Sequence, residues 1–76
     1  MMKISDEAVR ALEMQIESYK NRISTYNISI EKLSKMPENE VVKKIIDGYK
    51  KQVEFLKEKI FCLESDLVII KKIREE

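Results

Sequence analysis

Apolar residues in the first half of the chain recur at alternating steps of three and four. This spacing matches a heptad repeat with Val or Ile at each a position and Leu or Tyr at each d position. These positions form a first seam, which consists of Val9, Leu12, Ile16, Tyr19, Ile23, Tyr26, Ile30 and Leu33. Because such a seam is useful only against another helix, it predicts a long helix that packs on a helical partner.

A second seam follows Pro37 in a different register. It consists of Val42, Ile46, Tyr49, Val53, Leu56, Ile60, Leu63, Leu67 and Ile70. The first register, if continued, would place Pro37, Glu40, Lys44 and Asp47 at core positions, so the two seams are offset by two residues. One continuous rod needs one register, and the chain is therefore predicted to turn here.

The predicted fold is all-α, an antiparallel hairpin of two long helices, because a short turn makes consecutive helices antiparallel neighbours. We expect three segments in a single domain over residues 1–76: a helix over about 6–35, a turn over about 36–39 and a helix over about 40–74. With the turn near residue 37, the numbers of facing residues should sum to about 75.

Several local expectations follow from this arrangement. Ser5 is a suitable N-cap for the first helix, and Pro37 suits the first turn of the second helix, where proline is tolerated. Gly48 should lie near Tyr26, where a missing side chain leaves room for the ring. Acids at the start of the first helix should lie near bases at the end of the second; these are Asp6, Glu7 and Glu13, with Lys71, Lys72 and Arg74.

The second helix has more apolar residues than a two-helix seam needs. Its outer c and g positions hold Val41, Ile45, Gly48, Phe55, Cys62, Ile69 and Ile73. With the seam they cover an arc of about 160° of the helix. The matching flank of the first helix is mostly small or neutral, and includes Ala8 and Ala11.

An exposed apolar patch of this kind is typical of an interface. We therefore expect two hairpins to close a four-helix bundle, with a dimer favoured and a tetramer as the alternative. The residues expected in this interface are Ala8, Ala11, Ile45, Phe55, Cys62, Ile69 and Ile73. The other interpretation is a monomer whose patch is covered by a different protein.

The composition of the 76 residues supports a long-helix protein. Charged residues make up 38% of the chain, which has one Gly, one Pro and a net charge of +1. The near-zero charge gives no reason to expect nucleic acid or a membrane as the main partner. A single cysteine fits a reducing compartment, and no secretory signal or membrane-length apolar run is seen.

These features favour a cytoplasmic location. The abundance of Ile and Lys over Arg favours a low-GC bacterium or one of its phages as the source, in which case the location is the host cytoplasm.

The residues needed for most catalytic chemistry are missing from the sequence. There is no histidine, and one glycine cannot form a phosphate-binding loop. We therefore expect no enzymatic activity, cofactor or metal site. Cys62 is interpreted either as a small buried hydrophobe or as a thiol that meets its symmetry mate across a dimer axis.

One group of charges is a candidate binding site. Residues 18–30 contain no acid. The candidate basic patch consists of Lys20 and Arg22 with the facing Lys50, Lys51 and Lys57. It is either a solvated face or a contact for an acidic protein surface or a phosphate backbone, although Glu54 and Glu58 interrupt it.

The leading hypothesis is a small self-associating helical hairpin that regulates, inhibits or adapts another, unidentified protein by binding its surface. The first alternative is a purely structural coiled-coil scaffold. The second alternative is a nucleic-acid-binding accessory protein that uses the basic patch.

Overall fold

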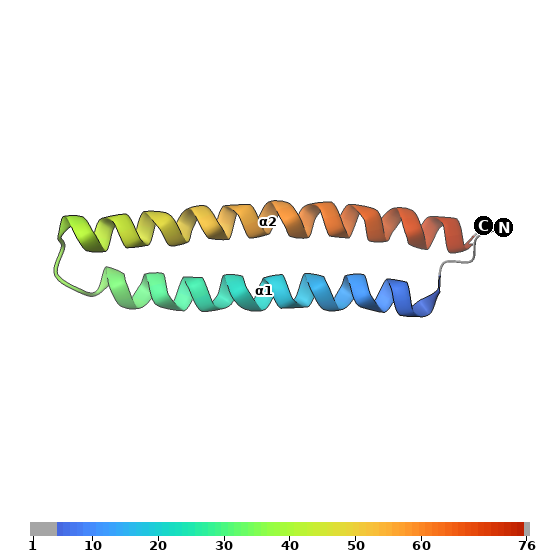
Figure 1. Cartoon of the computed structure of the whole chain (residues 1–76), viewed down its shortest axis with the longest axis horizontal. Helices are drawn as coiled ribbons and strands as arrows, with labels where there is room; N and C mark the ends of the chain where they lie inside the picture. Colours follow the sequence, from blue (N-terminus) through green and yellow to red (C-terminus); the bar gives the residue numbers. More distant parts are fainter. Residues whose placement is uncertain (1–4, 76) are drawn as a thin grey trace.

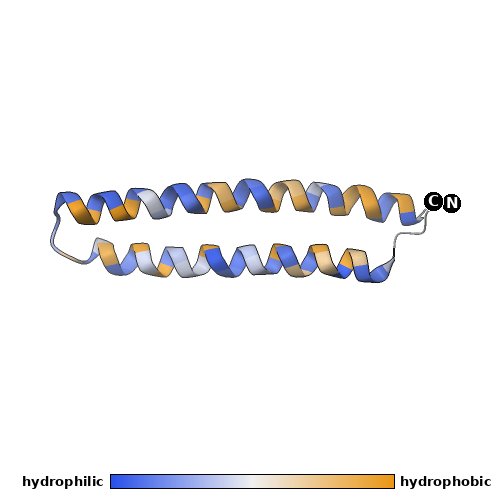
Figure 2. Ribbon diagram, viewed as in Figure 1, coloured by the Kyte–Doolittle hydropathy of each residue, from blue (hydrophilic) through white to orange (hydrophobic). Residues whose placement is uncertain are grey.

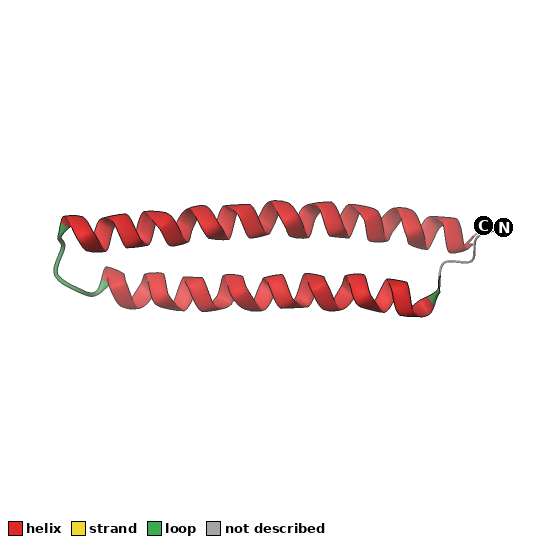
Figure 3. Cartoon of the chain, in the orientation of Figure 1, coloured by secondary structure: helices red, strands yellow, loops and turns green. Residues whose placement is uncertain are grey.

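The computed structural model shows an antiparallel hairpin of two helices and describes residues 5–75. Helix α1 (Asp6–Ser34) and helix α2 (Glu40–Glu75) lie side by side and are joined by residues 35–39 (Figure 1). Figure 3 shows that the described chain is helical except for this loop and Ser5. The molecule is a rod of 59 × 15 × 13 Å. The predicted all-α hairpin is confirmed, and each helix ends within one residue of its predicted end.

The core is a single layer of side chains between the two helices. Every position of both predicted seams is buried or half-buried. The most buried are Leu56, which is 5% exposed, and Val53, which is 6% exposed. No side chain of the described part of the chain is completely enclosed. The core is therefore thin, and each seam residue contributes a large share of it.

Both helices begin at a capping side chain. The hydroxyl of Ser5 accepts a hydrogen bond from the backbone N–H of Ala8 at 3.2 Å, as the sequence predicted. At the start of α2 the cap is Asn39, whose Oδ1 accepts from the backbone N–H of Val42 at 2.9 Å.

The prediction that Pro37 lies in the first turn of α2 is wrong. Pro37 precedes the Asn39 cap by two residues, and α2 begins only at Glu40. A proline disfavours helical backbone at the residue before it. Its position therefore fits a role in ending α1, while the stronger capping residue two positions later starts α2.

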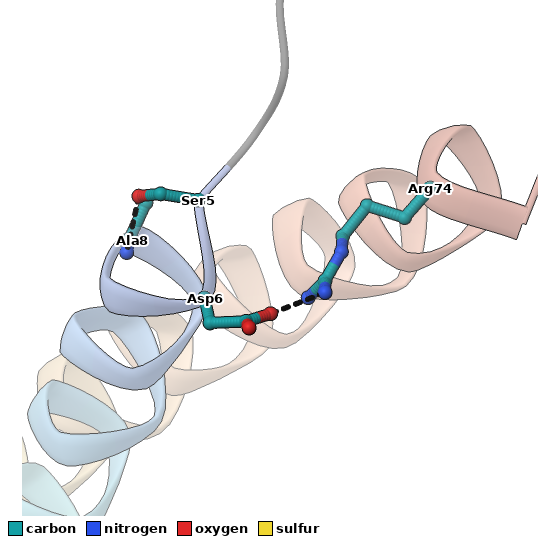
Figure 4. Close-up of polar contacts among 4 residues, drawn as sticks. All are labelled: Ser5, Asp6, Ala8 and Arg74. Atoms are coloured by element: carbon teal, nitrogen blue, oxygen red, sulfur yellow. Dashed lines mark hydrogen bonds and ion pairs between the residues drawn. The ribbon is translucent and has the colours of Figure 1, made fainter.

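The pairing of the helices follows the predicted register. The rings of Tyr26 and Tyr49, whose numbers sum to 75, are 5.3 Å apart between centroids and tilted by 42°. At the open end of the hairpin the guanidinium of Arg74 donates to the carboxylate of Asp6 (Figure 4). The Asp6 side chain is 87% exposed, so this ion pair contributes little to the stability of the fold. It shows that opposite charges meet at the open end, as predicted.

The structure corrects the expected role of Gly48. This residue is exposed, and a Cβ atom built on it would meet nothing within 4 Å. The ring of Tyr26 packs on Tyr49 instead, on the seam side of α2. The glycine therefore makes no room for a side chain within the hairpin.

We expect Gly48→Ala to stabilise the isolated hairpin by about 1 kcal/mol, because alanine restricts the unfolded chain and suits a helix interior better than glycine does. The free energy of unfolding from chemical denaturation at low protein concentration measures this gain. A loss of stability would contradict it and would mean that a packed neighbour lies against residue 48.

Candidate interaction surface

The most distinctive surface of the hairpin is a line of apolar residues along the outside of α2. We call it the outer stripe; it consists of Val41, Ile45, Gly48, Phe55, Cys62, Ile69 and Ile73. All seven residues are exposed, with Phe55 at 53% and Ile69 at 56%. In Figure 2 the hydrophobic colour is extensive on α2 toward its C-terminal end. The predicted apolar flank therefore stays uncovered within one chain.

The flank of α1 on the same side of the hairpin carries small and polar side chains. Ala8 and Ala11 are exposed there, as are Ser18 and Thr25. The charged flank lies on the opposite side, where a groove is lined by Asp6, Glu7, Val9, Arg10, Glu13, Lys71 and Arg74. In an antiparallel pair of helices the e positions meet on one side and the g positions on the other. The groove contains e positions of both helices, so the g positions, which carry little charge, lie together on the opposite side.

Three polar residues interrupt the outer stripe, and none of them was among the predicted site residues. They are Gln52, Lys59 and Asp66, at the remaining g positions of α2. The ammonium of Lys59 lies 5.2 Å from the centroid of the Phe55 ring. A cation at this distance from an aromatic ring gains about 0.5–1 kcal/mol at an exposed site. Lys59 therefore lies along the stripe and covers part of its largest side chain.

Cys62 is a free, exposed cysteine in the middle of the outer stripe. The expectation that it is a buried hydrophobe is not met within the single chain. Its neighbour Phe61 is 71% exposed and Val68 is 57% exposed, both on a different face of α2 from the stripe. The C-terminal half of α2 is consequently apolar on two outward faces.

The candidate basic patch is divided by the geometry of the hairpin. All five of its residues are exposed. Lys20, Lys50 and Lys57 share the charged flank by register, whereas Arg22 lies on the other flank with its guanidinium 5.9 Å from the Tyr19 ring.

Acids lie among the lysines of this patch. The ammonium of Lys57 is 3.7 Å from a carboxylate oxygen of Glu54. A shallow groove beside Phe55 is lined by Lys50 and Lys51 together with Glu54 and Glu58. The charge in this region is therefore mixed, and the patch is a weaker candidate than the outer stripe.

The accessible surface of the hairpin is large for its mass. It amounts to 6483 Å², about one third more than the roughly 4,900 Å² expected for a folded monomer of this size. A stable interface removes about 800 Å² from each partner. The excess reflects the elongated shape of the hairpin, and it exceeds the area that one such interface removes from each partner.

Comparisons with protein-family models, with curated proteins and with solved structures each found no match. Over the described residues, neither helix has an apolar stretch long enough to cross a membrane.

Proposed function

We propose that this protein is a non-enzymatic association module that binds a second copy of itself and acts by occupying the surface of another protein, as a regulator, inhibitor or adaptor. The observation that carries the proposal is the outer stripe, an uncovered apolar line along almost the whole length of α2. The absence of histidine from the sequence supports a role without catalysis.

The physical reason for self-association is the thin core. A chain of this size buries little apolar surface by itself and is only marginally stable as a monomer. Covering Phe55, Ile69 and Ile73 would add apolar burial worth about 25 cal/mol per Å² of surface removed from water. Aromatic side chains often dominate such interfaces, and Phe55 lies near the middle of the stripe.

The mass of the protein in solution tests this proposal directly. We expect twice the 9.0 kDa chain mass over concentrations from about 10 µM to about 1 mM by sedimentation or light scattering. A fixed dimer or tetramer fits a regulator, whereas growth without limit would favour the structural scaffold. A 9.0 kDa species at every concentration would refute self-association.

The partner-binding face is proposed to be the charged flank, which self-association through the outer stripe leaves free. Its lysines Lys20, Lys50 and Lys57 are all exposed. Reversing their charge should abolish capture of the partner protein from the native cells while the oligomer mass stays unchanged. Unchanged capture would remove the patch from the proposal.

A further inference from the structure

The outer stripe has an internal symmetry that indicates how a second copy would lie on it. When Gln52, Lys59 and Asp66 are counted with it, the line of residues continues at steps of three and four from Val41 to Ile73. Reversing the direction of α2 about residues 58–59 exchanges apolar positions with apolar positions and polar positions with polar positions. The c positions exchange about a point between residues 58 and 59, and the g positions exchange about residue 59, so the two centres agree to within half a residue. The exchanged pairs are Phe55 with Cys62, Gly48 with Ile69, Ile45 with Ile73 and Gln52 with Asp66. An antiparallel copy centred there would place apolar residues opposite apolar residues.

The matching flank of α1 has the same property about Ser18. Reversal close to that residue exchanges Ala8 with Ser29, Ala11 with Thr25 and Gln15 with Arg22, whose numbers sum to 36 or 37. The first two pairs are small, so two copies of α1 could approach closely there. The symmetry of α1 therefore supports the same arrangement independently of α2.

The two centres lie at the same height in the hairpin. Tyr26 packs on Tyr49, and Asp6 is paired with Arg74, so facing residue numbers sum to 75 near the loop and 80 near the open end. Between these two contacts, Ser18 faces the region of Lys59. A single two-fold axis can therefore pass through the middle of both helices.

We propose that the occupant of the outer stripe is a second copy of this chain, related by a two-fold axis perpendicular to the helices, with α2 against α2 centred between residues 58 and 59 and α1 against α1 centred at Ser18. This inference rests on the proposed self-association and specifies its geometry. The contact is isologous, so each pairing occurs twice.

Other orientations bury the stripe less well. A copy placed with its α1 on this α2 would set Phe55 against Arg22 and Ile45 against Lys32, because these numbers also sum to 77. A register centred on Cys62 would leave Ile45 beyond the end of the partner helix, in addition to Val41, which lies beyond that end in the favoured register as well. The favoured register has one cost, since Lys59 meets its symmetry mate, but its ammonium already lies along the helix over Phe55.

Engineered disulfides test the register without removing any apolar residue of the stripe. In a Cys62→Ser background, Gln52→Cys with Asp66→Cys should give a covalent dimer on mild oxidation, because residue 52 of each copy lies opposite residue 66 of the other. The two positions are about 21 Å apart within one helix, at about 1.5 Å per residue, so no bond can form inside a chain.

Two matched controls define the geometry. Each single cysteine variant in the Cys62→Ser background should stay free of disulfide dimers. Wild-type protein should also stay uncrosslinked, because the two Cys62 positions are offset by about 10 Å along the axis in this register.

The mass of each variant under reducing conditions separates the possible failures. A dimeric mass with the 52–66 crosslink supports the proposal. A dimeric mass without that crosslink, or with rapid crosslinking of wild-type Cys62, overturns the register but leaves self-association intact. A monomeric mass of wild-type protein overturns both.

Discussion

Replacing Phe55 and Ile69 together by glutamate is expected to convert the self-associated protein into a monomeric hairpin. Both side chains point away from α1 and are more than half exposed in the single chain, so neither substitution removes a core contact. Glutamate is also a good helix former, and α2 should keep its helical content.

The expected loss of affinity is large because the substitutions place charge where water is excluded. Each interface would contain four added carboxylates, two from each chain. Lys59 lies beside residue 55, whereas the outer c and g positions near residue 69 hold no base. An unpaired buried charge costs about 3–5 kcal/mol, so even one of them should weaken association by at least about 100-fold. Sedimentation or light scattering at a concentration where wild type is dimeric would show the mass fall to that of one chain.

A matched control is available on the same helix. Phe61→Glu with Val68→Glu also replaces one exposed phenylalanine and one exposed aliphatic residue, and it changes the net charge by the same amount. These residues lie off the outer stripe, so this variant should keep the wild-type mass. If both variants dissociate, or neither does, the outer stripe is not the interface.

The fold could be predicted because the hairpin is specified by contacts that the chain makes with itself. Each helix carries a complete seam, and the change of register at Pro37 is incompatible with a single rod. The position of the turn also sets which residues face each other. It accounts for the pairing of Tyr26 with Tyr49 and for the opposite charges of Asp6 and Arg74 at the open end. Patterns of this kind are repeated many times along the sequence, so a single misplaced residue does not change the conclusion.

Local details were harder to predict because they depend on one residue each. Asn39 and Pro37 are both acceptable near a helix start, and only the backbone geometry shows that Asn39 is the cap. Gly48 had a plausible neighbour in Tyr26, but a difference of one position on the helix directs residue 48 outward and residue 49 inward.

The candidate site is less determined for a different reason. The exposure of the outer stripe follows from its heptad positions, and the structure confirms it. The heptad positions do not identify what covers the stripe, because the surface that would pack against it is not part of the same hairpin. The internal symmetry of the stripe about residues 58 and 59 is the sequence feature on which the proposal of a second copy rests.

Replacing Leu56 by alanine is expected to be the most damaging truncation in the core. Leu56 is 5% exposed, the lowest exposure among the buried core residues, and it lies near the middle of the α2 seam. Loss of a buried leucine side chain costs about 2–5 kcal/mol, through lost transfer energy and the cavity left behind. A domain of this length has a total stability of only about 4–11 kcal/mol.

Leu56→Ala should therefore leave a substantial fraction of the protein unfolded, and self-association should fail with it because the outer stripe exists only on a folded α2. Val68→Ala is the control, since Val68 is 57% exposed on the same helix and its truncation should change stability by less than about 0.5 kcal/mol. Helix content during chemical denaturation, followed at two protein concentrations, measures both effects and separates folding from association. Equal losses in the two variants would mean that Leu56 contributes no more than an exposed residue, and that the thin layer between α1 and α2 does not hold the hairpin together.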